Sequence, residues 1–113
     1  LAILEKNLAL YLRNSDVFIN LAGGIRTSDP SLDLAILAAI ISSLKDIPIP
    51  ENSVFIGEVG LNGEIRPVAQ IETRINEAIK LGYDKIYISS YAKLKNRAKV
   101  IKLKDVKGLY GLF

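Results

Sequence analysis

The sequence contains no cysteine and no histidine among its 113 residues. Without cysteine the chain has no disulfide framework and no thiolate site. The two absences together argue against zinc, iron–sulfur and histidine-dependent triad chemistry. A Walker-type phosphate loop is missing as well, so the chain by itself is not expected to bind ATP through one. We therefore predict no metal site and no cofactor within these residues.

Long apolar runs are absent too. The longest extends from Leu34 to Ile41, which is far too short to cross a bilayer, and residues 1–12 lack the pattern of a secretory signal. We expect no membrane partner. Half of the residues are hydrophobic, enough for a single folded domain over residues 1–113. The first residue is leucine rather than methionine, which suggests a fragment of a longer protein.

Positive charge is concentrated in the second half of the chain. Residues 1–62 carry four basic and seven acidic side chains, whereas residues 63–113 carry eleven basic and five acidic ones. Such an excess fits either a solvated face or a contact with a polyanion such as nucleic acid, and charge alone does not decide between them. The densest basic stretch consists of Lys93, Lys95, Arg97, Lys99, Lys102, Lys104 and Lys107.

Hydrophobic periodicity and turn residues divide the chain into alternating elements. Helices are predicted at residues 1–12, 29–45, 70–81 and 106–112, with a short helical turn at 91–97. Strands are predicted at 17–22, 53–59, 64–68, 85–89 and 100–101, with a further strand position around 25–27 left open. These interleaved elements indicate an α+β fold with a mixed sheet packed against helices.

Three local signals set the element boundaries. Asp29 followed by Pro30 is typical of a helix start, because aspartate caps free amides and proline has no N–H to lose there. The Asn-Gly pair at 62–63 favours a tight hairpin turn, and Gly82 is a helix stop. In the helix at 70–81, the side chains predicted to face the core are Ile71, Ile75, Ala78 and Ile79.

Ser31 is the one candidate nucleophile in a suggestive setting. It lies in the first turn of a helix, where unpaired amides and the positive end of the helix dipole can stabilise an oxyanion. First-turn serines are also common for purely structural reasons, so position alone does not make Ser31 catalytic. Asp29 and Asp33 are four residues apart at the same helix start and are interpreted as capping and dipole-compensating residues rather than as a metal site.

Several segments together resemble the Lon-type Ser–Lys protease domain over residues 17–90. They are Asp29-Pro30-Ser31, Gly57-Glu58-Val59, the stretch from Gly63 to Val68, and the helix from Ile71 to Gly82. Within that family, the sequences of residues 57–68 and of the stretches at 33–35 and 42–48 are similar to those of the RadA (Sms) family of bacterial DNA repair proteins. The resemblance implies a Lon protease-like domain (an arrangement also called ribosomal protein S5 domain 2-like) from the C-terminal part of a longer protein.

The chain departs from the protease pattern at the position of the general base. Ser31 matches the nucleophile, but Arg74 stands where the family has its catalytic lysine. A lysine can be made neutral by burial, whereas arginine stays charged and cannot accept the proton of a serine. Leu32 and Asp33 replace the glycines that usually follow the serine, and Asp33 is expected to place negative charge near the oxyanion. We therefore predict no catalytic residues, with Ser31 and Arg74 as degenerate dyad positions.

The resemblance also implies a function for the parent protein. That protein is expected to be an ATP-driven DNA translocase in recombination and repair. It would have ATP, Mg and Zn sites outside this domain, a cytoplasmic location in bacteria, and the recombinase RecA as a candidate partner. The domain itself is predicted to bind single-stranded or branched DNA and to help assemble a hexameric ring. The candidate DNA contacts are Arg26, Arg66, Arg74, Lys93, Lys95, Arg97 and Lys99.

Two alternatives stay open. The domain could be an active peptidase that uses Ser31 with an unrecognised base, or an assembly module without DNA contact. The role of Arg74 is open as well, because its side chain could bind a phosphate or pair with Asp29 or Asp33.

Overall fold

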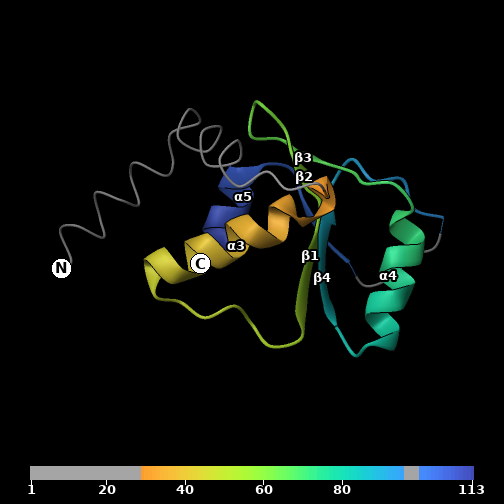
Figure 1. The fold of residues 1–113 in the computed structure, drawn as a ribbon, viewed down its shortest axis with the longest axis horizontal. Coiled ribbons are helices and arrows are strands. Elements are labelled where there is room, and N and C mark those ends of the chain that lie inside the picture. Colours follow the sequence, from red (N-terminus) through yellow and green to blue (C-terminus); the bar gives the residue numbers. More distant parts are fainter. Residues whose placement is uncertain (1–28, 96–99) are drawn as a thin grey trace.

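The computed structural model describes residues 29–95 and 100–113, in the order of elements shown in Figure 1. A short 3-10 turn leads into a long helix, and three strands and a helix follow before the last two strands and a closing helix. The elements are η1 (Pro30–Leu32), α3 (Asp33–Lys45), β1 (Ser53–Ile56), β2 (Glu58–Val59), β3 (Ile65–Arg66), α4 (Ile71–Lys80), β4 (Lys85–Ser89), β5 (Val100–Leu103) and α5 (Val106–Gly111). The helix predicted at 1–12, the strand at 17–22 and the strand position at 25–27 lie outside the described residues.

A three-stranded parallel sheet with the order β1-β4-β5 forms the centre of the described fold. β4 pairs with β1 on one side, from Ser53–Lys85 to Ile56–Ile88, and with β5 on the other. Side chains alternate between the two faces of a strand. Accordingly, Tyr87 packs into a cluster with α3 and α5, whereas Ile86 and Ile88 pack into a second cluster with α4. The sheet thus separates α4 from α3 and α5 (Figure 1).

The hairpin β2–β3 forms a sheet of its own, because the strand predicted at 53–59 is interrupted at Gly57. β2 and β3 pair antiparallel. A single mixed sheet had been predicted, but in the described ranges the parallel and antiparallel pairings belong to two separate sheets. The predicted turn is confirmed: Gly63 takes a φ of 79°, and the Gly60 N–H donates to the Glu64 carbonyl at 2.8 Å. A left-handed glycine closing a three-residue loop is a common hairpin geometry.

Helix α3 agrees with the predicted element at 29–45. Asp29 caps the preceding turn by accepting the Ser31 N–H, and the helix ends at Lys45, followed by Asp46 in the left-handed conformation. One face is fully buried against the sheet, which explains the apolar run in the sequence. Its buried apolar residues are Leu34, Leu37, Ala38 and Ile41.

Helix α4 confirms the predicted element at 70–81, with one error in its buried face. Ile71, Ile75 and Ala78 are buried, but Ile79 is 48% exposed. Ile79 is one position beyond Ala78, so a further 100° of rotation turns it away from the sheet. After the helix, Gly82 adopts a φ of 97° and its N–H donates to the Ile79 carbonyl, the expected left-handed termination.

The C-terminal elements match their predictions except for one segment. β4 occupies the predicted residues, β5 extends two residues further than predicted, and α5 lies within 106–112. The helical turn predicted for 91–97 is wrong where the structure describes it, because residues 92–95 form no helix after the turn at 90–91. Ser89 accounts for this: its hydroxyl accepts the Tyr91 N–H and donates to the Ile65 carbonyl, fixing an irregular path. Within the described ranges, no helix is both long enough and apolar enough to span a membrane.

Candidate functional site

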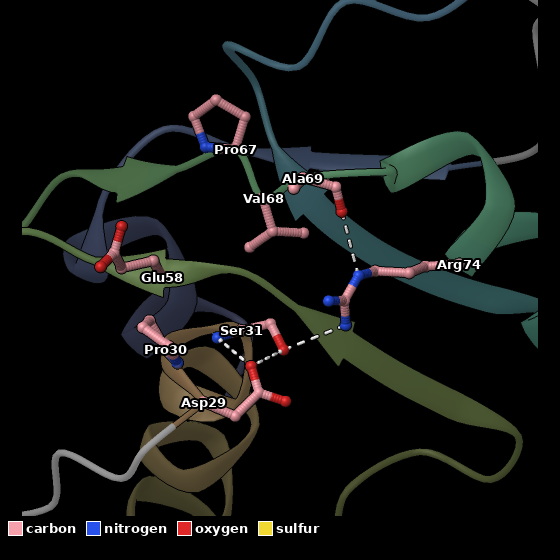
Figure 2. A pocket seen from close by; sticks show the side chains of 8 residues that line it. All are labelled: Asp29, Pro30, Ser31, Glu58, Pro67, Val68, Ala69 and Arg74. Atoms are coloured by element: carbon pink, nitrogen blue, oxygen red, sulfur yellow. Dashed lines mark hydrogen bonds between the residues drawn. The ribbon is translucent and has the colours of Figure 1, made fainter.

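A pocket of about 250 Å³ lies between the start of α3, the β2–β3 hairpin and the start of α4. Figure 2 shows Ser31 and Arg74 pointing toward each other across it, with Asp29 beneath the serine and Val68 above. The lining therefore joins the two predicted dyad positions with the residues just before Ser31 and with residues from two other segments. It consists of Asp29, Pro30, Ser31, Glu58, Pro67, Val68, Ala69 and Arg74.

Ser31 is held on both its backbone and its side chain. Its carbonyl accepts the Gly57 N–H at 3.2 Å, and the Gly57 carbonyl accepts the Leu34 N–H at 3.0 Å, so Gly57 ties η1 and α3 to the end of β1. The Asp29 carboxylate accepts both the Ser31 N–H at 3.1 Å and the Ser31 hydroxyl at 2.6 Å. Ser31 is 6% exposed. The serine thus has a single, well-supported position.

Arg74 reaches the pocket from the first turns of α4. Its Nε donates to the Ala69 carbonyl at 3.1 Å, and its Nη1 donates to the Ser31 hydroxyl oxygen at 3.1 Å. Gln70, just before the helix, has a φ of 57°, a conformation that costs a non-glycine residue energy. This left-handed residue turns the chain between Ala69 and α4 and lies next to the carbonyl that orients the guanidinium.

The hydrogen bonds that link Arg74, Ser31 and Asp29 all donate in one direction, toward the aspartate. Arg74 donates to Ser31, and Ser31 donates to Asp29. These hydrogen bonds from the Ser31 hydroxyl and N–H, with a smaller contribution from the nearby Arg74 charge, lower the pKa of Asp29 below its usual value. Asp29 is therefore ionised at neutral pH, and a carboxylate of low pKa is a poor acceptor for the proton of a serine.

Asp33 does not lie beside the Ser31 hydroxyl, as its position in the sequence suggested. It is completely buried, and its Oδ2 accepts the Val59 N–H at 3.2 Å. It is not among the pocket residues, so it does not bring charge to Ser31. The reason is helical rotation: two residues after Ser31, the side chain turns inward toward β2 rather than outward to the pocket. Its Oδ1 is buried without a hydrogen-bond partner.

The described candidate DNA contacts other than Arg74 are not among the pocket-lining residues. Arg66 is exposed and pairs with Glu64 at 3.1 Å, while Lys93 and Lys95 are exposed in the segment after β4. The remaining three candidates, Arg26, Arg97 and Lys99, lie outside the described residues.

More basic side chains lie along and after the edge strand β5. Lys102 is exposed and aligns with Ile88, whose side chain faces α4, so it lies on the α4 side of the sheet. Lys104 and Lys107 are exposed after β5 and on α5, which covers the other side. The basic residues thus flank the β5 edge from both sides of the sheet.

Sequence reasoning missed most of the pocket lining. Asp29 was predicted as a cap and as a candidate partner of Arg74, but not as the acceptor of the Ser31 hydroxyl, although its position two residues before Ser31 is the spacing at which aspartate bonds nearby groups. For Glu58 and residues 67–69, no sequence pattern other than the family resemblance pointed to a place in the site. These residues meet Ser31 only through the pairing of β2 with β3 and the turn into α4.

Comparison with known families gives an independent assignment. Residues 2–91 match the family model ChlI, described as "Subunit ChlI of Mg-chelatase". The match covers most of the chain and includes the whole 17–90 segment. This chain belongs to the ChlI family.

Individual relatives of this ChlI-family chain are named DNA repair protein RadA. The Rickettsia conorii protein is 46% identical over 109 residues, covering 95% of this chain and 24% of that protein. The Streptococcus pneumoniae protein is 51% identical over 88 residues, covering 78% of this chain and 21% of that protein. The similarity to RadA predicted from the motifs is confirmed. The chain spans about a quarter of the length of these relatives.

Proposed function

We propose that this chain is a non-proteolytic, Lon-like module of a RadA-type DNA repair protein. The hydrogen bond from Arg74 to the Ser31 hydroxyl carries the proposal. In a Ser–Lys peptidase the residue at that place must remove the serine proton, whereas here it donates a hydrogen bond to the serine oxygen. A guanidinium remains charged in proteins, so this arrangement cannot be reversed by deprotonating Arg74.

Two further features of the pocket oppose peptide hydrolysis. The Ser31 N–H, which lies where a helix start offers donors to an oxyanion, already donates to Asp29. The Ser31 hydroxyl also donates to Asp29, whose lowered pKa makes it a weak base. Of the two described residues bonded to the Ser31 hydroxyl, neither Asp29 nor Arg74 is therefore a competent base, and the Ser31 amide already has an acceptor. The inactivity rests on these contacts rather than on Asp33.

A serine-directed probe tests this part of the proposal. The parent chain and Ser31→Ala would be treated with a fluorophosphonate and with unstructured peptide substrates, with an active Ser–Lys peptidase as positive control. We expect no labelling and no cleavage by either variant. Labelling of the parent chain that disappears in Ser31→Ala would establish the peptidase alternative.

The DNA-contact part of the proposal rests on the basic residues around β5. Exposed lysines can neutralise phosphates without reading sequence, which suits a protein that acts on varied branched or single-stranded DNA. Lys102, Lys104 and Lys107 join the earlier candidates in this surface. We place ATP, Mg and Zn binding, RecA contact and ring formation in the longer, cytoplasmic bacterial protein of which this chain would form the C-terminal domain.

Charge reversal of the β5 lysines tests the DNA contact. The full-length protein carrying Lys102→Glu, Lys104→Glu and Lys107→Glu would be compared with a matched Lys80→Glu variant, since Lys80 is exposed on α4. If these lysines contact phosphates, affinity falls at least tenfold and the slope of log K against log salt decreases by about 2–3. Unchanged binding with an intact ring, seen by native mass spectrometry, would favour the assembly-only alternative.

A further inference from the structure

We infer that Asp29, Ser31 and Arg74 form a clasp that ties helix α4 to the helical layer on the other side of the sheet, and that Arg74 is therefore not a DNA contact. The degenerate dyad would thus have a conformational role, beyond the proposed function. The inference rests on how α4 is held, on the bonds of the guanidinium, and on the charge of the pocket.

Helix α4 has a limited apolar attachment. It buries Ile71, Ile75 and Ala78 against one face of the sheet, while Ile79 is exposed. Helix α3 packs in a separate apolar cluster on the opposite face. Among the described helices, Figure 1 shows α4 on one side of the sheet and α3 and α5 on the other. The apolar clusters therefore fix each helix to the sheet but do not join the helices to each other.

The hydrogen bonds of Arg74 provide that connection. The Arg74 side chain extends from α4, and its guanidinium donates one hydrogen bond to the Ala69 carbonyl and another to the hydroxyl of Ser31, which lies just before α3. The receiving side is rigid, because the Ser31 carbonyl is bonded to Gly57 and its hydroxyl to Asp29. Figure 2 shows this continuous path from α4 to Asp29. Loosening the clasp should therefore release α4 rather than α3.

The chemistry of arginine suits this role better than that of lysine. Nε and Nη1 are two donors fixed in one plane, and here they reach two acceptors in different segments. A lysine ammonium is a single point charge on a flexible stem and does not hold two such acceptors in a fixed geometry. The arginine that stands in place of the catalytic lysine is thus also the residue that can bond two segments at once.

The setting of Arg74 opposes a phosphate contact. Among the described lining residues, Arg74 lies beside two carboxylates, Asp29 and Glu58, and the bonds from Ser31 keep the pKa of Asp29 below its usual value. A phosphate approaching Arg74 would therefore come close to these carboxylates. The pocket also adjoins the end of β1, whereas the lysines flank β5, on the other side of β4. Parallel neighbours are spaced about 4.8 Å apart, so β1 and β5 are separated by about 10 Å.

Hydrogen–deuterium exchange of the α4 amides in the full-length protein tests the clasp. We expect Ser31→Ala to increase exchange of residues 74–81 by about tenfold, the effect of losing one charge-assisted hydrogen bond. Arg74→Gln, which also removes the bond to the Ala69 carbonyl, should increase exchange at least as much. Because both changes break the bond between Ser31 and Arg74, the double variant should exchange no faster than Arg74→Gln alone. Arg74→Lys should fall between Arg74→Gln and the parent protein. Lys80→Gln, which removes an exposed charge from the same helix, should leave exchange unchanged.

DNA affinity, measured on the same variants, separates the clasp from a phosphate contact. We expect Arg74→Gln, Ser31→Ala and Lys80→Gln to bind DNA alike. Unchanged α4 exchange in Arg74→Gln would overturn the inference. So would a loss of DNA affinity in Arg74→Gln that Ser31→Ala does not share. If the protein fails to bind DNA at all, the proposed function fails, and the clasp is still judged by the exchange data.

Discussion

Substitution of Gly57 by alanine tests how the fold positions Ser31. The Gly57 N–H and carbonyl bond to Ser31 and Leu34. A Cβ placed on Gly57 would lie 3.1 Å from Cγ2 of Ile65 and 3.2 Å from Cδ2 of Leu34. Both neighbours are fully buried, so neither can move into solvent. One methyl group therefore presses the start of α3 away from the β2–β3 hairpin.

The expected cost follows from this close packing. Adding a methyl group to a well-packed core typically costs about 1–3 kcal/mol, because neighbours must leave their preferred rotamers or the backbone must shift. Both neighbours here belong to the same cluster, which favours the upper half of that range. For a urea m-value of about 1–3 kcal/mol/M, Gly57→Ala should lower the midpoint by about 1 M or somewhat more.

Urea denaturation of the 113-residue chain, followed by far-UV circular dichroism, measures this effect. Gly111→Ala is the matched control, since a Cβ there meets nothing within 4 Å and the residue lies in helix α5. It should leave the midpoint unchanged or raise it, because alanine is favoured over glycine in helices by about 0.5–1 kcal/mol. Equal midpoints for Gly57→Ala and the parent chain would refute the view that Leu34 and Ile65 pack too closely on Gly57 to admit a methyl group.

Three further predictions follow from other contacts. Asp105→Ala should destabilise the chain by about 0.5–2 kcal/mol in the same assay, because it removes the cap that accepts the Gly108 N–H at 3.0 Å. Ile41→Ala should cost about 2–5 kcal/mol, since Ile41 is buried in the main cluster; a loss below 1 kcal/mol would argue against the α3 packing. The pKa of Asp29 is lowered from 3.8 by its bonds from Ser31, so its stabilising contribution is present above that value and lost as pH falls below it. The free energy of unfolding of the parent chain should therefore exceed that of Asp29→Asn at pH 7, and the difference should shrink toward pH 3. A difference that stays constant over this pH range would contradict the prediction.

Most boundaries of the described elements were predictable from sequence because local chemistry sets them. Asp29 and Pro30 start the turn before α3, and Gly63 and Gly82 supply the positive φ values that their turns require. The error at Ile79 arose because apolar character does not fix which residues of a short helix touch the sheet. The break at Gly57 was missed because the apolar pattern of 53–59 is that of one continuous strand, whereas the pairing partners of its two halves differ.

The sequence by itself determined the α+β class, the similarity to RadA proteins, and the presence of arginine where a base is needed. These depend on residue identity, which requires no coordinates. Only the tertiary structure showed that Arg74 donates a hydrogen bond to the Ser31 hydroxyl. They are 43 positions apart and belong to separate elements, so their contact depends on how α4 returns along the sheet. The structure also turned Asp33 into the core and Asp29 toward the serine, because helical rotation, not sequence proximity, selects which carboxylate faces the pocket.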